Sequence, residues 1–312
     1  MVSSSTLKEL LNEYDKKQMI AISDLEKRKS ELYARIPRLQ EIETELNSFA
    51  IKTAKALLVK FDPSYISELQ NKANDLKLER ETILKKDGKD ISYLSPHYEC
   101  SKCKDTGYVL DDGKSVMCSC LKQQILNIEY NNSNIGNLDR ENFKKFNLNL
   151  YSDEVNEEKY GSDLSPRENI KVIGKEVKKF IKNFDDPNEK NLLFSGGTGL
   201  GKTFLSNCIV AELLAKGKTV LYQTAPVMLD TLISELFDKN SNNAFSQNLL
   251  TVDLLVIDDL GTETMNSMKF TELYKIINTR LLNQNGKITK TIISTNLDLQ
   301  SLFRTYDERI VS

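Results

Sequence analysis

The sequence contains no tryptophan and only one histidine, His97, among its 312 residues. With a single imidazole, catalysis based on histidine is nearly excluded. No apolar run approaches the roughly 20 residues that a membrane-spanning helix needs. The first residues, MVSSSTLKELLNEYDKK, lack the apolar core of a signal peptide. We therefore expect a cytoplasmic protein with no membrane partner.

The sequence also has no excess of basic over acidic residues. The 43 lysines and arginines and the 45 acidic residues leave a net charge of −2, so no global basic field indicates nucleic acid. Any nucleic-acid contact would have to be local. The five cysteines of a cytoplasmic chain indicate metal binding or chemistry rather than disulfides. The length is sufficient for about two domains.

Glycine is absent from residues 6–86, which are rich in Glu, Lys, Leu and Ile. Apolar residues recur there at helical spacing, and charges fill the remaining positions. Pro37 and Pro63 each mark a kink or the first turn of a helix. The pattern predicts two or three long helices, arranged as a hairpin or coiled-coil arm over residues 1–90. A solvated arm and a docking module that shares its apolar seam with another protein both fit this pattern.

Four of the five cysteines form a C-x2-C pair and, after fourteen intervening residues, a C-x-C pair: Cys100, Cys103, Cys118 and Cys120. Two short apolar runs between them, 108–110 and 115–117, flank a turn and predict a hairpin that returns the second pair to the first. Four thiolates would then surround one structural Zn²⁺ in a module spanning residues 91–130. The alternatives are unrelated thiols, a redox C-x2-C pair, or His97 in place of one cysteine. Cys208 follows an apolar helical pattern and is expected in the core.

The stretch GGTGLGKT follows a short apolar run and precedes a helix-like pattern, which is the setting of a phosphate-binding P-loop. Its glycines let the backbone bring N–H groups close to an anion at the start of a helix. We expect Lys202 to reach the β- and γ-phosphates of ATP and Thr203 to ligate Mg²⁺. A glycine-rich turn with a chance lysine is the alternative. The eight positions are Gly196, Gly197, Thr198, Gly199, Leu200, Gly201, Lys202 and Thr203.

From residue 191 onward, predicted strands alternate with predicted helices, which indicates an α/β fold with a parallel sheet. A polar connector over residues 131–164 and a helix over 165–184 precede this pattern. The expected strands are 192–195, 219–224, 254–259 and 289–295, and the expected helices between them are 204–216, 227–237 and 269–284.

Asp258 and Asp259 end the third expected strand, at the edge where open α/β sheets bind their ligands. Asp258 fits the Walker-B carboxylate that holds Mg²⁺, and Asp259 is placed to orient or deprotonate the attacking water. Asn296 follows the fourth strand, and its amide could bind the γ-phosphate or the water. Paired acids can also be ordinary strand ends, but a P-loop upstream favours the catalytic interpretation.

The motifs IDDLGTE (257–263), STN (294–296) and YDERIVS (306–312), added to the P-loop, resemble the AAA+ ATPases of the bacterial helicase-loader group, DnaC and DnaI. The IstB-like ATPases of insertion sequences are close relatives of that group. The resemblance is strong over about 165–312 and weaker for the cysteine block and the preceding helices. It implies a central P-loop strand, self-association through the ATPase domain, and contact with single-stranded DNA and a hexameric replicative DNA helicase. It also implies that Asn296 is sensor 1.

The sequence departs from the common AAA+ pattern in two places. Asp258-Asp259 stands where Asp-Glu is usual, as it often does in the helicase-loader group, and the shorter carboxylate predicts slow hydrolysis. An arginine finger follows an ERI-x-S-R pattern in the family, whereas this sequence stops at Ser312. We therefore expect the ATPase domain of residues 165–312 to be C-terminally incomplete, truncated before that arginine, and we do not assign its role to Arg309.

The expected function is ATP-dependent loading of the replicative helicase onto single-stranded DNA, with ATP as a switch. An IstB-like regulator of transposition and a non-hydrolysing adaptor are the alternatives. Three basic residues of the ATPase domain are candidates for DNA contact by charge alone, and ordinary solvated charge is favoured for them: Lys216, Lys218 and Arg280. Three aromatic residues either wrap the adenine or, as is more usual in a connector, anchor it to the core: Phe143, Phe146 and Tyr151.

Overall fold

The computed structural model describes residues 4–59, 63–131, 138–238, 241–282 and 287–306. One compact unit contains residues 8–116, and the other contains the remaining residues, chiefly 117–312. Within the described ranges, no helix is both long enough and apolar enough to cross a membrane. The division into four domains expected from the sequence stays a prediction.

Three long helices make up most of the first unit: α1 (Ser4–Arg35), α2 (Pro37–Val59) and α3 (Pro63–Lys86). Pro37 and Pro63 each begin a helix, because a proline at the first helical position loses no hydrogen bond. Arg38, near the start of α2, forms an ion pair with Glu79, near the end of α3, at 2.8 Å, so the two helices run antiparallel. The predicted helical hairpin is confirmed for these two helices.

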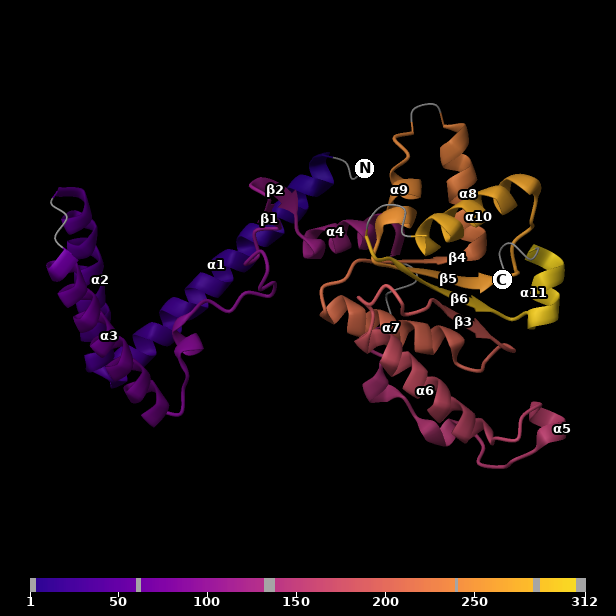
Figure 1. Ribbon diagram of the computed structural model, residues 1–312, viewed down its shortest axis with the longest axis horizontal. Helices are drawn as coiled ribbons and strands as arrows, with labels where there is room; N and C mark the ends of the chain where they lie inside the picture. The colour runs from indigo at the N-terminus through magenta and orange to yellow at the C-terminus, as the bar shows by residue number, and fades with distance from the viewer. Residues whose placement is uncertain (1–3, 60–62, 132–137, 239–240, 283–286, 307–312) are drawn as a thin grey trace. The chain divides into compact units, whose positions relative to one another are not determined.

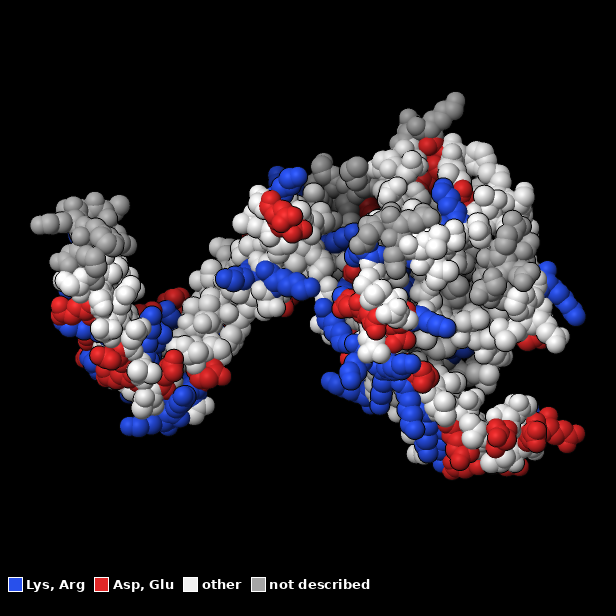
Figure 2. Space-filling model, viewed as in Figure 1, with Lys and Arg blue, Asp and Glu red and all other residues white. Residues whose placement is uncertain are grey.

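Apolar contacts hold this helical unit together more than its charges do. Leu32, Leu39 and Leu84 are buried against one another where the three helices meet. Burying a leucine stabilises a fold by about 1.5–3 kcal/mol, whereas an exposed ion pair contributes about 0–1 kcal/mol. Figure 2 shows acidic and basic side chains interspersed over α2 and α3, as expected of a solvated surface.

The cysteine-rich segment is built on a short hairpin of β1 (Tyr108–Asp111) and β2 (Lys114–Met117), preceded by the 3-10 turn η1 (Ile91–Leu94). The two residues between the strands, Asp112 and Gly113, have φ values of 46° and 75°. Asp-Gly at two positive φ values is the favoured two-residue turn, because its twist matches that of the strands. The predicted hairpin is confirmed.

The second unit contains a four-stranded sheet in the order β3-β6-β5-β4, with all strands parallel. Each strand begins and ends within one residue of its predicted position. Among the described residues β3, which leads into the P-loop, is an edge strand, so the central position implied by the family resemblance is not reached. The strands are β3 (Leu192–Ser195), β4 (Val220–Thr224), β5 (Leu254–Leu260) and β6 (Lys290–Thr295).

Helices cover both faces of this sheet (Figure 1). One face packs against α6 and α7, through Phe180 and Ile209 among others. The opposite face packs against α8 to α11, through Met228, Leu273 and Leu302. The short helices α9 and α11 were not predicted. The bounds are α6 (Pro166–Lys182), α7 (Lys202–Ala215), α8 (Ala225–Phe237), α9 (Ala244–Thr251), α10 (Ser267–Leu281) and α11 (Leu299–Tyr306).

The segment after the cysteines packs along the outer edge of β4. It consists of α4 (Ser119–Leu126) and a π-helical turn, η2 (Asn127–Asn131). The Gln123 side chain accepts from the Val220 N–H at 2.6 Å and donates to the Val220 carbonyl at 3.0 Å. Asn131 accepts from the Tyr222 N–H at 2.9 Å. Two side-chain amides thus bond main-chain groups of Val220 and Tyr222 at the edge of β4.

The connector from residue 138 to α6 contains only short turns, as predicted: η3 (Phe143–Lys145), η4 (Leu148–Leu150) and α5 (Glu157–Tyr160). Ser165 then caps α6 in a reciprocal capping box with Glu168, followed by Pro166 in the first turn. Such a box satisfies two free N–H groups at the start of a helix. The predicted start of this helix is confirmed.

Candidate nucleotide-binding site

The glycine-rich loop joins β3 to α7 at the carboxyl edge of the sheet, and Gly201 directly precedes the helix. Gly201 has a φ of +93°, and a Cβ there would lie 2.8 Å from the Tyr151 hydroxyl. That hydroxyl donates to the Leu200 carbonyl at 3.2 Å. Partial burial raises the pKa of Tyr151, which keeps the hydroxyl a donor. Only glycine therefore fits here, and the connector braces the loop.

The ammonium of Lys202 joins the loop to the end of β6. It donates to the Gly196 carbonyl at 2.7 Å, the Gly197 carbonyl at 2.9 Å and the Asn296 Oδ1 at 2.7 Å. In the described part of the chain no carboxylate pairs with it, so neutral oxygens hold a full positive charge in a solvent-open loop. This arrangement suits a phosphate, and it brings Lys202 and Asn296 together as the sequence predicts.

The Asp258 carboxylate lies directly behind the loop and is only 4% exposed. Thr203 donates to its Oδ2 at 3.2 Å, Tyr222 donates to the same oxygen at 2.6 Å, and Ser294 donates to Oδ1. Burial and the neighbouring carboxylate raise the pKa of Tyr222 far above its usual range. The oxygens of Thr203 and Asp258 lie side by side, and hard oxygen ligands are what Mg²⁺ prefers.

Asp259 occupies an irregularity in the pairing of β5 with β6, between Ile257 and Leu260. Its φ is +54°, and its N–H donates to Ser294 Oγ at 3.1 Å. A bulge of this kind re-aims a side chain relative to the regular strand. No described residue donates a hydrogen bond to its half-exposed carboxylate, which leaves that group open to water. The geometry is compatible with a water-orienting base.

The four clustered cysteines meet as the spacing predicts. One ligand atom from each of Cys100, Cys103, Cys118 and Cys120 lies within 4.8 Å of all the others. A tetrahedral zinc with bonds of about 2.3 Å to sulfur places the sulfurs about 3.8 Å apart. Four thiolate ligands complete the tetrahedral coordination of a structural zinc, so the residues present fit zinc.

A buried carboxylate shapes the first cysteine pair. Asp105 accepts from the N–H groups of Glu99 at 2.9 Å and Cys100 at 2.8 Å. Asp105 and its neighbour Lys104 both have positive φ values, 56° and 52°. Aspartate tolerates this left-handed region better than most residues. The turn therefore folds back on itself and presents both thiols on one side.

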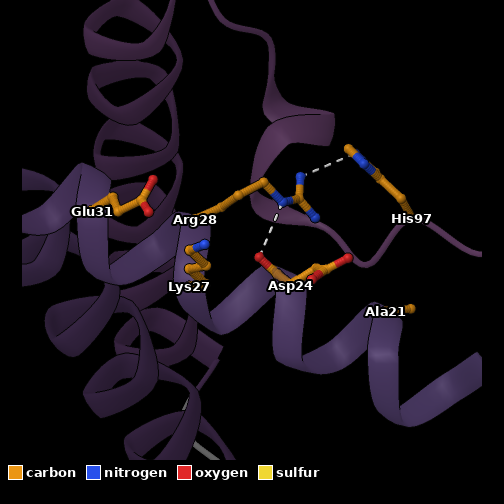
Figure 3. A pocket seen from close by; sticks show the side chains of 6 residues that line it. All are labelled: Ala21, Asp24, Lys27, Arg28, Glu31 and His97. Carbon is orange, nitrogen blue, oxygen red and sulfur yellow. Dashed lines mark hydrogen bonds between the residues drawn. The ribbon is translucent and has the colours of Figure 1, made fainter. Parts of the chain in front are cut away.

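His97 lies in a different place. Arg28 on α1 contacts the His97 Nε2 at 3.1 Å and donates to the carbonyls of Tyr93 at 2.9 Å and Ser95 at 3.0 Å. Figure 3 shows His97 turned toward Arg28 across a pocket that Asp24 also lines. Since the cysteine cluster already has four thiols, His97 is not needed as a substitute ligand.

Arg280 corrects one expectation. It is 2% exposed, so it is neither solvated nor able to touch DNA. Its guanidinium donates to the carbonyls of Leu249 at 2.7 Å, Val252 at 3.1 Å and Lys290 at 2.6 Å. Burial lowers the pKa of Arg280 to about 9. Arg280 thus caps carbonyl groups at the end of α9 and at the start of β6.

The other basic candidates are also engaged. Lys216 donates to the Ile181 carbonyl at 2.7 Å, and Lys218 pairs with Asp185 at 2.5 Å. Figure 2 instead shows basic side chains gathered over α6. The spacing of four, three and four residues puts four exposed lysines on one helical face, and none has an ion pair in the described ranges: Lys171, Lys175, Lys178 and Lys182.

Two aromatic residues of the connector stack on each other, and one of them also contacts α7. Phe146 lies 6.1 Å from Tyr151 and 5.9 Å from Phe204, between ring centroids. Phe143 packs against the core between α6, α7 and the sheet. These contacts support the anchoring alternative, while contact with adenine stays a prediction. Cys208 is fully buried, as expected, and burial raises the pKa of its thiol to about 12.

Three residues of these sites escaped the sequence interpretation: Tyr222, Ser294 and Asp105. Ser294 stands in the STN motif, and Asp105 in the Cys-Lys-Asp-Thr-Gly turn, so both had a local signal. Tyr222 had none, because its strand is simply apolar. Arg309 and the segment from 307 onward lie outside the described residues.

Residues 175–311 match the family described as "IstB-like ATP binding protein". The match assigns this part of the chain, residues 175–311, to an IstB-like ATP-binding domain. Lys202, Thr203, Asp258 and Asn296, which meet at one edge of the sheet, all belong to this IstB-like domain.

Curated relatives of the IstB-like domain include the replicative helicase loader DnaC of Escherichia coli K12. It is 29% identical over 138 residues, which are 43% of this chain and 54% of that protein. The uncharacterized protein YdaV of the same strain is 30% identical over 121 residues, 39% of this chain and 47% of YdaV. This chain therefore spans about half the length of these relatives. A crystal structure of the DnaC helicase loader aligns with a TM-score of 0.40 and 26% identity, covering 50% of this chain and 89% of that one.

Proposed function

We propose that this protein is an ATP-dependent loader of a hexameric replicative DNA helicase onto single-stranded DNA. The observation that carries the proposal is the meeting of Lys202 with Asn296 and of Thr203 with Asp258 at one sheet edge. This set suits a triphosphate with Mg²⁺, and DnaC is a named relative of the same domain. Lys202 and the loop amides bind phosphates, and Thr203 and Asp258 hold the metal.

Hydrolysis is slow and acts as a switch in this proposal. Asp259 orients or deprotonates the attacking water, and Asn296 contacts the γ-phosphate or that water. ATP holds the loader in the helicase- and DNA-engaged state, with self-association through the ATPase domain. Hydrolysis then releases the helicase.

The parts of the chain divide the work. The arm (1–90) binds the helicase, the four-cysteine module (91–130) holds Zn²⁺, the connector (131–164) braces the P-loop, and the ATPase domain (165–312) binds ATP and DNA. Apolar side chains exposed on α1 support a docking role for the arm, since Met19 is 70% exposed and Ile20 is 61% exposed. The lysine face of α6 suits a phosphate backbone.

Co-purification of the full chain with a replicative helicase, with and without ATP and Mg²⁺, tests the loader. Replacing Met19 and Ile20 with serine should weaken the capture of helicase at least tenfold, because exposed apolar anchors carry such contacts. Asp15→Ser with Lys16→Ser is a matched control, since both residues are exposed in α1 one turn before Met19 and Ile20. Capture of a transposase but not of helicase would favour the IstB-like transposition regulator. Helicase capture with no ATP turnover would favour the non-hydrolysing adaptor.

A further inference from the structure

A tyrosine hydroxyl stands behind the proposed metal-holding carboxylate. Tyr222 lies in β4, opposite Val256 in the register of β4 with β5, so its side chain reaches Asp258 two residues further along β5. The hydroxyl donates to Asp258 Oδ2 at 2.6 Å, and the whole residue is 2% exposed. A buried tyrosine needs a partner for its hydroxyl, and here the partner is the carboxylate that also accepts from Thr203 of the P-loop.

Both oxygens of that carboxylate have buried donors. Ser294 donates to Oδ1, while Tyr222 and Thr203 share Oδ2. Hydrogen bonds on both oxygens fix the rotation of the carboxylate about its terminal bond. Hydrogen bonds to a charged acceptor are also stronger than those between neutral groups. The carboxylate is therefore oriented before any ligand arrives.

The Asp259 N–H also donates to Asp258 Oδ1, at 3.2 Å. The three side-chain donors have different roles in the proposed function. The Thr203 hydroxyl, 3.2 Å from Oδ2, is the group that P-loop proteins direct to the metal. Once it turns to that task, Tyr222 is the remaining donor on Oδ2. Its main chain is held too, because the Tyr222 N–H donates to Asn131 Oδ1 at 2.9 Å. Tyr222 is therefore fixed at both its backbone and its hydroxyl.

We propose that Tyr222 is a positioning residue of the nucleotide site, whose hydroxyl holds the Asp258 carboxylate in the orientation that receives Mg²⁺ with ATP. This inference rests on the function proposed above. Tyr222 acts through Asp258 and does not itself touch the nucleotide. Its hydroxyl therefore supports the metal-dependent part of ATP affinity, and the binding of phosphate to the loop does not depend on it.

The test compares the full-length protein with Tyr222→Phe, which removes one oxygen and keeps the ring. The Kd of a fluorescent ATP analogue is measured with excess Mg²⁺ and again with EDTA. The Kd in EDTA divided by the Kd in Mg²⁺ reports the metal's contribution to affinity. We expect this ratio to fall about tenfold, from a hydrogen bond to a charged group, while the Kd in EDTA stays unchanged. The Mg²⁺ concentration at half-maximal binding should rise. Tyr130→Phe, a half-buried tyrosine of the same unit, should leave the ratio at its wild-type value.

The outcomes separate this inference from the proposed function. An unchanged ratio in Tyr222→Phe, with or without a lower melting temperature, would mean that the hydroxyl has only a structural role and does not affect the metal. A larger ratio would mean that it competes with the metal. Either result overturns the inference and leaves the ATP site standing. Should Tyr222→Phe fail to fold, Ser294→Ala must lower the same ratio, because it removes the hydroxyl that donates to Oδ1. Wild-type protein that binds no ATP, or binds it without help from Mg²⁺, would overturn the proposed function itself.

Discussion

Replacing Asp259 with asparagine should abolish ATP turnover and leave ATP binding intact. The structure makes this exchange conservative. Asp259 has a φ of +54°, a backbone region that asparagine tolerates as well as aspartate does. Its carboxylate is half-exposed and accepts no hydrogen bond from any described residue, so the free energy of unfolding should change by less than about 0.5 kcal/mol.

The expected loss in rate is large because an amide cannot accept the proton of the attacking water. General-base catalysis contributes about 10² to 10⁴ in rate, which corresponds to about 3–5 kcal/mol in the activation barrier. The Kd for ATP with Mg²⁺ should stay equal or decrease, since removing a negative charge relieves repulsion with the triphosphate. Asp259 is placed to act on the water and does not hold the loop.

Phosphate release under single-turnover conditions measures the chemical step, and a fluorescent ATP analogue measures affinity in the same preparations. Asp163→Asn is the matched control, because Asp163 is an exposed acid of the same unit and should leave turnover unchanged. Turnover at the wild-type rate in Asp259→Asn would refute the assignment. A loss of affinity together with rate would mean that Asp259 holds the nucleotide or its metal.

Further predictions concern the remaining features. Purified protein should contain about one zinc per chain by atomic absorption, and Cys103→Ser should lose the metal and melt at a lower temperature, because four thiolates complete the site. Arg280→Met should lower the free energy of unfolding by roughly 3 kcal/mol in urea titrations, since several buried carbonyls lose their donor; an unchanged midpoint would contradict its capping role. Lys175→Gln with Lys178→Gln should reduce the slope of log affinity for single-stranded DNA against log salt by about 1.4. A slope identical to that of the wild type would mean that DNA does not bind at these lysines of α6.

The strands and the P-loop could be predicted from the sequence because their signals are local. Each strand of the ATPase unit contains a short apolar run, as in LLVI before Asp258. The order of glycines before Lys202 requires one backbone path. The capping box at Ser165 and the Asp-Gly turn of the hairpin are equally local. Helices α9 and α11, of eight residues each, were missed because two turns give too little periodicity.

The roles of Tyr222 and Arg280 could not be predicted because their partners are distant in the sequence. The Tyr222 hydroxyl meets a residue 36 positions away, and its function depends on strand register. Arg280 looks like any surface arginine near the end of a helix. Only the packing of α9 against α10 and the sheet buries it, and carbonyl groups carry no sequence signal. Charge alone was therefore a poor guide to DNA contact.

The side-chain amides of Gln123 and Asn131 form hydrogen bonds with β4 of the kind that a neighbouring strand would form. An open strand edge is a template for pairing with another molecule, and proteins commonly block such edges. Here the N–H and carbonyl of Val220 and the N–H of Tyr222 are already occupied by side chains. A second copy of the protein therefore finds fewer free main-chain groups along β4 with which to extend the sheet. Replacing both Gln123 and Asn131 with alanine would free these main-chain groups, and we expect the variant to aggregate on storage.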